Sequence, residues 1–319
     1  MATNHLNNPI FQDADKARAW LESHIWPDGP VCGYCGSVNN ATALATRPGY
    51  HQCNEPKCRC QFTVMVGTLF ERSHIPLNKW LMAAFLLCAS KKGISAHQMH
   101  RMIGVSYKST WFMMHRLREA LREPFPEERG PLGGSGKVVE ADETYIGGKE
   151  KNKHIGKRNT RNIGGQGKQI VFSLVERGGS VRSKHVPQVS AHTLRPILVA
   201  QVDRKSTLMT DDAGQYRIVG PEFDRHESVN HSANEYVRGD AHTNTIEGYF
   251  SILKRGITGT YHHVSQQHLK RYLAEFDFRY NERSALEVDD KLRAEKALKG
   301  IVGKRLTYRR TGDGANQQA

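Results

Sequence analysis

The hydrophobic positions divide the chain into three zones with different periodicities. Residues up to about 72 are rich in loops, whereas residues 76–125 repeat apolar side chains at helical spacing almost throughout. The third zone follows a Pro- and Gly-rich linker, "REPFPEERGPLGGSGK", and alternates strand-like runs with later helices. We therefore predict a multidomain α/β protein with a domain boundary in this linker.

Four strand-like runs open the third zone, and two amphipathic helices follow them. The runs are "KVVEADETYI", "QIVFSLVE", "VRSKHVPQV" and "STLMTD". The expected core stripe of the first helix, within "HTNTIEGYFSILKRG", consists of Ile246, Phe250, Leu253 and Ile257. The second helix is expected to begin near Ser265.

A helix-turn-helix is predicted within residues 76–125. Gly93 is expected to end a first helix, and Ser95 and Ser106 are expected to cap the two that follow. In this motif the last helix enters the major groove of DNA. The candidate DNA contacts on its leading turns are Tyr107, Lys108 and Ser109, and its expected core stripe is Trp111, Met114, Leu117 and Leu121. The alternative is a plain three-helix bundle without a DNA role.

Five of the six cysteines lie in the first zone. Cys32 and Cys35 form a C-x-x-C pair, and Cys53, Cys58 and Cys60 follow in "HQCNEPKCRCQF". Two close pairs separated by a loop can surround one tetrahedral zinc ion, because short turns bring the thiolates together. We predict a zinc ribbon over residues 16–72 with Cys32, Cys35, Cys53 and Cys58 as ligands. Cys60 remains the alternative to Cys58, and incidental thiols remain the alternative to a metal site.

The net charge of the chain indicates what kind of partner it binds. Lys and Arg number 46 against 32 Asp and Glu, and the net charge of +14 indicates a polyanionic partner, with nucleic acid first and an acidic membrane second. No apolar run reaches the roughly 18 residues of a membrane span, and the N-terminus lacks the pattern of a secretory signal. We expect a cytoplasmic protein without a membrane partner.

Acidic residues lie at two of the predicted strands. Asp142 lies in "VVEADETYIGG" between Glu140 and Glu143, and "STLMTDDAGQY" ends its strand in Asp211 and Asp212. If the two strands are neighbours, these carboxylates converge and can bind a divalent ion.

A third acidic candidate lies on the first helix of this zone. Glu247, Ser251 and Lys254 share the flank opposite the core stripe. The alternative is a capping box, with Asn244 as N-cap, Glu247 at the third helical position and Lys254 as a surface charge. Two strand aspartates followed by a helical glutamate in a basic protein favour an RNase H-like nuclease.

The sequence resembles the DDE-superfamily insertion-sequence transposases of the ISXO type, which carry an N-terminal zinc ribbon. The resembling stretches run from about residue 16 to 283 and are "CGYCG", "CRCQFTVMVGTLFERSHIPLNKW", "VEADETYIGGK", "TDDAGQY" and "HTNTIEGYFSILKRGITGTYHHVSQQHLKRYLAEFDFRYNER". The resemblance implies an RNase H-like α/β catalytic domain over residues 138–285. Residues 286–319 would then form a C-terminal tail, whose final stretch, "RRTGDGANQQA", is expected to be disordered.

The resemblance also implies an active site with two Mg²⁺ or Mn²⁺ ions. Its metal ligands and catalytic residues would be Asp142, Asp211 and Glu247, followed by the basic residue Lys254. The family's second aspartate follows Thr or Ser and precedes a Tyr by five positions, which favours Asp211 over Asp212. Related groups place an asparagine or histidine third, so the alternatives at that place are Asn244 and His242.

The implied function is that of the transposase of a bacterial insertion sequence. Such an enzyme binds the terminal inverted repeats, cleaves DNA and joins it to target DNA, as at least a homodimer on double-stranded DNA at the nucleoid. The basic stretch over residues 147–168 would hold the phosphate backbone, and its candidate contacts are Lys157, Arg158 and Arg161; alternatively, it is a solvated linker. The main alternative function is a DNA-binding regulator or a domesticated, inactive transposase. A nuclease that hydrolyses DNA without joining it is a more distant one.

Overall fold

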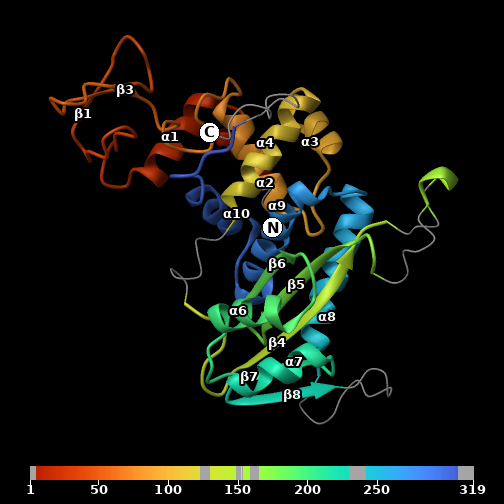
Figure 1. Cartoon of the computed structure of the whole chain (residues 1–319). Coiled ribbons are helices and arrows are strands. Elements are labelled where there is room, and N and C mark those ends of the chain that lie inside the picture. The colour runs from red at the N-terminus through yellow and green to blue at the C-terminus, as the bar shows by residue number, and fades with distance from the viewer. Residues whose placement is uncertain are drawn as a thin grey trace, which may run out of the picture. The chain divides into compact units, whose positions relative to one another are not determined.

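The computed structural model describes residues 5–122, 130–148, 152, 154–158, 165–229 and 242–307 (Figure 1). The chain forms two compact units. The first unit combines the chain up to residue 121 with the chain from residue 288, and the second spans residues 122–287.

The first unit contains a small three-stranded antiparallel sheet. After helix α1 (Ala14–Ile25), strands β1 (Ala41–Ala43), β2 (His51–Cys53) and β3 (Gln61–Phe62) pair in the order β1-β2-β3. The local core consists of Cys32, Cys53 and Phe62, with Trp26 packed against it. So small an apolar core contributes little free energy, and a structural metal is the usual supplement in a module of this size.

Three helices follow the small sheet, and the second and third of them have serine N-caps. They are α2 (Leu77–Ala89), α3 (Ala96–Ile103) and α4 (Tyr107–Ala120). As predicted, the Ser95 hydroxyl accepts from Gln98 N at 3.1 Å and the Ser106 hydroxyl accepts from Ser109 N at 3.3 Å. Gly104 adopts φ +69°, the left-handed conformation that ends α3. The helix-turn-helix arrangement is thus present in the structure.

Two details of the helical zone differ from prediction. Helix α2 ends at Ala89, before Gly93, because the Ser90 hydroxyl donates to Leu86 O at 2.7 Å and its backbone turns extended. Trp111 is half-buried, and the buried face of α4 includes Thr110 and Met113 in its place. The face of α4 that packs is therefore rotated slightly from the expected one.

The C-terminal segment is folded into the first unit, which corrects the prediction of a tail from residue 286. Helix α10 (Asp290–Lys299) packs against α2, with Asp289 as N-cap. Buried Arg293 donates to Cys88 O at 3.1 Å and Val288 O at 3.0 Å. Periodicity within ten residues could not reveal partners 205 positions away. The stretch "RRTGDGANQQA", for which disorder was expected, lies entirely outside the described residues.

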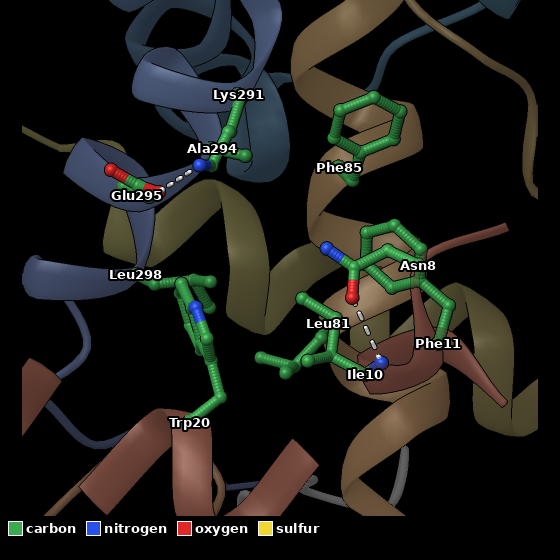
Figure 2. A pocket seen from close by; sticks show the side chains of 10 residues that line it. All are labelled: Asn8, Ile10, Phe11, Trp20, Leu81, Phe85, Lys291, Ala294, Glu295 and Leu298. Atoms are coloured by element: carbon green, nitrogen blue, oxygen red, sulfur yellow. Dashed lines mark hydrogen bonds and ion pairs between the residues drawn. The ribbon is translucent and has the colours of Figure 1, made fainter. Parts of the chain in front are cut away.

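A cavity of about 300 Å³ lies within the first unit (Figure 2). Helices α1, α2 and α10 line it with Trp20, Leu81, Phe85 and Leu298, and Phe11 of the short helix η2 (Pro9–Phe11) completes the apolar wall. Lys291 and Glu295 form an ion pair of 3.9 Å at its polar side. This largely apolar cavity contains none of the predicted catalytic residues.

The second unit is built on a five-stranded mixed sheet. Its strands are β4 (Val138–Ile146), β5 (Gln169–Glu176), β6 (Val181–Val186), β7 (Thr207–Asp211) and β8 (Arg225–Val229). Their order is β6-β5-β4-β7-β8; β4, β5 and β6 pair antiparallel, whereas β7 and β8 run parallel to β4. Three antiparallel strands followed by two parallel ones are the sheet of an RNase H-like domain, as predicted.

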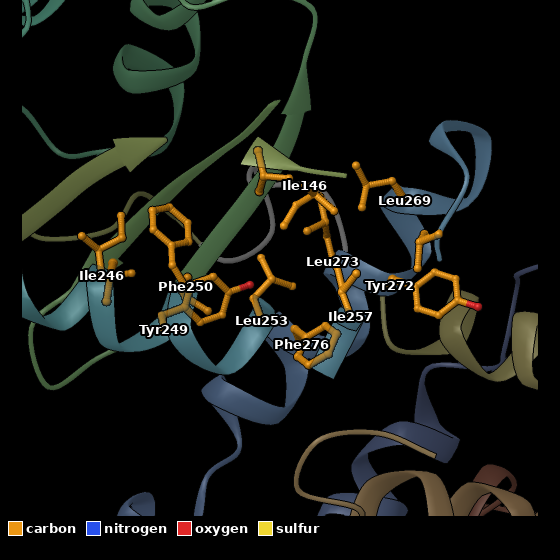
Figure 3. Close-up of a cluster of buried hydrophobic side chains, with 14 residues drawn as sticks. Ile146, Ile246, Tyr249, Phe250, Leu253, Ile257, Leu269, Tyr272, Leu273 and Phe276 are labelled. Carbon is orange, nitrogen blue, oxygen red and sulfur yellow. The ribbon is translucent and has the colours of Figure 1, made fainter. Parts of the chain in front are cut away.

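Hydrophobic clusters cover both faces of this sheet. Helices α8 (Asn244–Gly256) and α9 (Gln266–Asn281) pack on the face that carries Ile146 and Val171 (Figure 3). Helices α6 (Ala191–Gln201) and α7 (Gly214–Val219) pack on the face that carries Val139 and Ala141. The shorter helical segments are η1 (His5–Asn7), η4 (Ile155–Lys157), η5 (Gly220–Glu222), η7 (Ile257–Tyr261) and η8 (Ser284–Leu286).

Helix α9 also closes the edge of the sheet at β6. The Asn281 side chain accepts from Val181 N at 2.7 Å and donates to Val181 O at 3.0 Å, as a neighbouring strand would. Asp277 Oδ2 accepts from Ser183 N at 2.8 Å. These bonds protect an otherwise open edge and fix α9 on the sheet.

Candidate active site

Asp142 and Asp211 lie on adjacent parallel strands. Val139 pairs with Leu208, and Glu140 pairs with Met209. The same offset, continued two residues further, sets Asp142 level with Asp211. The sheet therefore brings together two carboxylates that lie 69 positions apart in the sequence.

The electrostatics show that a third predicted carboxylate joins them. The pKa of Asp142 is raised to about 8. Burial is the largest cause, the charges of Glu143, Asp211 and Glu247 add to it, and the Glu143 backbone amide, which donates to Asp142 Oδ1 at 2.7 Å, opposes it. Glu247 comes from α8, so three separate elements contribute to one acidic group. Such a group is stabilised when a cation neutralises it.

Glu143 is a fourth carboxylate at this place, and it was not singled out from the sequence. Tyr216 OH donates to Glu143 Oε2 at 2.6 Å, and Gln215 Nε2 donates to Oε1 at 3.2 Å. Burial raises the pKa of Glu143, and the Asp211 charge adds to this shift. Strand alternation places Glu143 on the α7 side of the sheet, opposite Asp142. The available signal was its position directly after Asp142.

Asp211 and Asp212 have different environments. Asp212 forms a salt bridge with the exposed Arg217, whose Nη2 lies 2.8 Å from Oδ1 and 2.9 Å from Oδ2. Asp211 instead acts on Asp142 and Glu143, and its Oδ1 accepts from Ala213 N at 3.3 Å. The acidic group thus includes Asp211, whereas Asp212 belongs to a surface ion pair.

The start of α8 differs from the expected capping box. Asn244 is the first helical residue rather than the N-cap, which is Thr243. The Thr243 hydroxyl donates toward Glu247 Oε1 at 3.5 Å, and the amide of Ile246 donates to Glu140 Oε2 at 2.9 Å. A carboxylate of β4 therefore supplies the cap that the local sequence was expected to supply.

Glu140 has further partners around this helix start. The Glu140 side chain is fully buried, and its Oε1 accepts from Arg177 Nε at 2.7 Å and from Thr245 Oγ1 at 2.9 Å. Arg177 Nη2 also donates to His242 O at 2.8 Å. His242, an alternative third ligand by sequence, lies in this network, with its Nδ1 3.5 Å from Glu140 Oε1.

The polar stripe of α8 faces away from the core. Asn244, Glu247, Ser251 and Lys254 are all exposed. The buried residues on the opposite side include Ile246, Tyr249, Phe250 and Leu253, which Figure 3 shows against the second helix and the sheet. The charge of Glu247 acts on Asp142, so the stripe approaches the acidic group at Glu247.

The carboxylate oxygens of the acidic group lie further apart than the ligands of a single metal ion would. Among the described residues, the cysteines of the ribbon are the one set of three or more acidic, histidine or cysteine side chains whose ligand atoms all lie within 4.8 Å of one another. Mutual repulsion separates carboxylates, and a site for two ions about 3.5–4 Å apart spreads its ligands more widely. The hard oxygen donors suit Mg²⁺ or Mn²⁺.

The cysteine group has the dimensions of a zinc site. Cys32 Sγ lies 3.8 Å from Cys58 Sγ, and Cys35 Sγ lies 3.7 Å from Cys53 Sγ. In a tetrahedron with zinc–sulfur bonds of about 2.3 Å, the sulfurs are separated by about 3.8 Å. Cys60 lies outside this set, and its thiol donates to Cys58 O at 3.3 Å. The four cysteines of the group are thus the four predicted ones.

One ribbon thiol is already poised as a thiolate. Burial opposes ionisation of Cys32, but the backbone amides of Cys35 and Tyr34 outweigh it and lower the pKa of Cys32 to about 7. Thiolates are the form that binds zinc.

The structure describes the candidate DNA contacts except Arg161. Tyr107, Lys108 and Ser109 are exposed at the start of α4, and the Tyr107 ring stacks on His97 with centroids 4.2 Å apart. Arg158 is exposed, and Lys157 ends η4. Arg161 lies outside the described residues. None of the described helices is long and apolar enough to cross a membrane.

Comparisons with known proteins match both parts of the chain. Residues 12–61 match a transposase zinc-ribbon domain, and residues 131–281 match an ISXO2-like transposase domain. A curated relative, an uncharacterized protein in transposable element ISH50 of Halobacterium salinarum, is 31% identical over 285 residues, which cover 84% of this chain and 91% of that protein.

Two solved structures also align with the chain. They are a pre-cleavage Mos1 transpososome, at 13% identity, and a Mos1 strand transfer complex, at 14% identity. Each has a TM-score of 0.28, and each alignment covers 68% of this chain and 73% of the other.

Proposed function

Because the chain belongs to the family of ISXO2-like transposases, we propose that it is the transposase of an insertion sequence. In this proposal it binds the ends of its element and catalyses metal-dependent DNA cleavage and strand transfer. The observation that carries the proposal is the acidic group: Asp211 and Glu247, from separate elements, both raise the pKa of Asp142. Carboxylates gathered in this way repel one another, and a bound cation would neutralise them.

The carboxylates would act as ligands for two Mg²⁺ or Mn²⁺ ions. When bound, these ions would neutralise charge at the phosphate and make a water or a 3′-hydroxyl a stronger nucleophile. Asp142, Asp211 and Glu247 are the proposed ligands. Tyr216 and Gln215 hold Glu143 beside them by hydrogen bonds, so Glu143 adds negative charge without being free to swing.

The exposed stripe of α8 would face the DNA. Lys254 lies two turns after Glu247 and is the proposed contact to a phosphate or terminal nucleotide. Asn244, the alternative third-position residue, starts the helix and is exposed beside Glu247. Of these two, Glu247 is supported by its electrostatic effect on Asp142.

The first unit would recognise double-stranded DNA. Tyr107, Lys108 and Ser109 are exposed and begin the helix that enters the major groove in a helix-turn-helix. Lys157, Arg158 and Arg161 are the proposed backbone contacts of the second unit. Joining two element ends to target DNA calls for a homodimer or larger assembly on DNA, located at the nucleoid in the cytoplasm.

The ribbon would hold one structural zinc ion. The sulfur separations of Cys32, Cys35, Cys53 and Cys58 fit a tetrahedral ion, and the lowered pKa of Cys32 favours binding. In this proposal the metal supplies folding free energy that the small ribbon core lacks.

A strand-transfer assay tests the proposed activity. Purified full-length protein, Mg²⁺ and DNA that carries candidate element ends are incubated with target DNA, and joined products are measured for wild type and Asp142→Asn. We expect the variant to bind the ends as wild type does and to join none. Joining by Asp142→Asn at the wild-type rate would refute the proposed active site. Wild-type binding without cleavage in Mg²⁺ or Mn²⁺ would instead identify a DNA-binding regulator.

A further inference from the structure

The first turn of α8 is held by a side chain from another element. The amides of a helix's first turn lack partners within the helix, and a residue just before the helix usually caps one of them. Here the amide of Ile246 donates to Glu140 Oε2 at 2.9 Å, across 106 positions of sequence. The neighbouring Thr245 hydroxyl donates to Glu140 Oε1 at 2.9 Å. Two consecutive residues of α8 are thereby tied to β4.

Glu140 is a fully buried carboxylate, and its charge is balanced. Arg177, from the turn after β5, donates through Nε to Glu140 Oε1 at 2.7 Å. The same guanidinium donates through Nη2 to His242 O, at 2.8 Å, just before the helix. A carboxylate at a helix N-terminus also interacts favourably with the helix dipole. A buried charge is tolerated only with such partners. Glu140 and Arg177 therefore hold the start of α8 in a fixed position on β4.

The contact between Glu140 and the start of α8 connects two of the proposed metal ligands. Glu140 lies two residues before Asp142 on β4, and alternation gives both side chains to the same face of the sheet. Ile246, which Glu140 caps, lies directly before Glu247. Strand β4, which supplies Asp142, therefore also fixes the position and direction of helix α8, which supplies Glu247.

We propose that Glu140 is a positioning residue that docks the start of α8 on β4 and so sets Glu247 against Asp142 for divalent-metal binding. This inference rests on the proposed function, because it assumes that Asp142 and Glu247 share metal ions. Glu140 itself touches neither substrate nor metal. Its loss loosens the first turn of α8 and weakens the affinity for Mn²⁺, even where the rest of the fold is intact.

Mn²⁺ binding by the full-length protein without DNA tests the proposal. Free Mn²⁺ is measured by electron paramagnetic resonance during titration of wild type, Glu140→Gln and Thr245→Val. Glutamine turns an acceptor into a donor that opposes Arg177 or the Ile246 amide, so we expect affinity to fall about tenfold or more. Thr245→Val removes one hydrogen bond at nearly constant volume and is expected to weaken binding about two- to threefold.

Tyr249→Phe is the matched control in the same helix. Tyr249 OH donates to the buried Asp277 at 2.5 Å, so this variant also removes a buried bond from α8 to a carboxylate, but away from the first turn. We expect its Mn²⁺ affinity to stay within about twofold of wild type while its melting temperature falls. A loss of affinity equal to that of Glu140→Gln would show that general loosening of α8 is enough, and would overturn the positioning role.

The rate of amide hydrogen exchange at Ile246 is a second measurement, and it tests the inference in the wild-type protein even if a variant does not fold. In wild type the Ile246 amide should be protected although it lies in a first turn, and Thr245→Val should reduce this protection. Free exchange of Ile246 in wild type would overturn the inference, even if Glu140→Gln fails to fold.

The outcomes also separate this inference from the proposed function. If Asp142→Asn binds Mn²⁺ as wild type does, the metal site and the proposed activity fail together. If Asp142→Asn loses affinity while Glu140→Gln and Thr245→Val keep it, only the positioning role fails.

Discussion

Asp142 on β4 and Asp211 on the parallel neighbour β7 lie at equivalent positions, each two residues beyond the paired residues Glu140 and Met209. The register turns two acidic residues from distant parts of the sequence into one site. Burial makes their repulsion costly, and the raised pKa of Asp142, about 8, is the consequence. The proposed metal ions would relieve this cost.

Repulsion among the carboxylates should make the stability of the protein without Mg²⁺ or Mn²⁺ depend on pH. The pKa of an aspartate in an unfolded chain is about 3.9, whereas burial raises the pKa of Asp142 in the fold to about 8. Between these values the folded chain binds more protons, so the contribution of this group to the free energy of unfolding falls as pH rises from about 4 to about 8. Asp142→Asn should therefore raise the melting temperature, measured in buffer without added Mg²⁺ or Mn²⁺, more at pH 8 than at pH 5.

Asp212→Asn serves as the control for that measurement. It removes an ion pair with an exposed arginine, which is worth roughly 0–1 kcal/mol, and should show little of this pH dependence. An equal gain from Asp142→Asn at both pH values would contradict the assignment of a buried, repelled carboxylate.

The ribbon cysteines should divide by their place in the sulfur tetrahedron. Cys58 Sγ lies 3.8 Å from Cys32 Sγ, whereas the Cys60 thiol is directed to Cys58 O. We expect Cys58→Ser to lower zinc content per chain well below one and Cys60→Ser to leave it near one, measured by atomic emission after dialysis. The reverse result would move the fourth ligand to Cys60.

Removal of the zinc should unfold the ribbon. Its core is too small to supply much stability without metal. A strong chelator should therefore abolish amide protection in residues 32–62 while the sheet of the second unit keeps its own. Full protection of both after zinc removal would show that the metal is dispensable for folding.

Lys108 should contribute to DNA binding through phosphate contact. It is exposed at the start of α4, where a helix-turn-helix meets the groove. Lys108→Gln should lower affinity at each salt concentration and reduce the slope of log affinity against log salt by about one. Lys299→Gln removes the same charge from the exposed side of α10 and should leave the slope unchanged. Equal effects of both variants would indicate a response to net charge alone.

Local structure was predictable where the deciding contacts are local. The apolar run of β5 and the serines before α3 and α4 predicted these elements, because strand alternation and N-caps act within a few residues. The spacing of the cysteines favoured Cys58 with Cys60 as the alternative, and the structure groups Cys58 with the C-x-x-C pair and Cys53. The acidic triad came from a family resemblance, and the register of β4 and β7 adds a physical reason for its first two members.

Long-range contacts account for what the pattern missed. The cap of α8 comes from Glu140, 106 positions away, so a local capping box could only be guessed. The bonds from Arg293 to Cys88 and Val288 fold a segment that looked like a tail. Glu143 joins the acidic group through Tyr216 of α7, which alternation along one strand cannot show.

The measurement that tests the central claim most directly is strand transfer by Asp211→Asn and Asp212→Asn, side by side. The two changes are chemically identical and adjacent, but Asp211 acts on Asp142 and Asp212 pairs with Arg217. We predict that Asp211→Asn lowers the joining rate about 100-fold or more, whereas Asp212→Asn stays close to wild type. Equal rates for the two variants, or loss only in Asp212→Asn, would contradict an active site built on Asp142, Asp211 and Glu247.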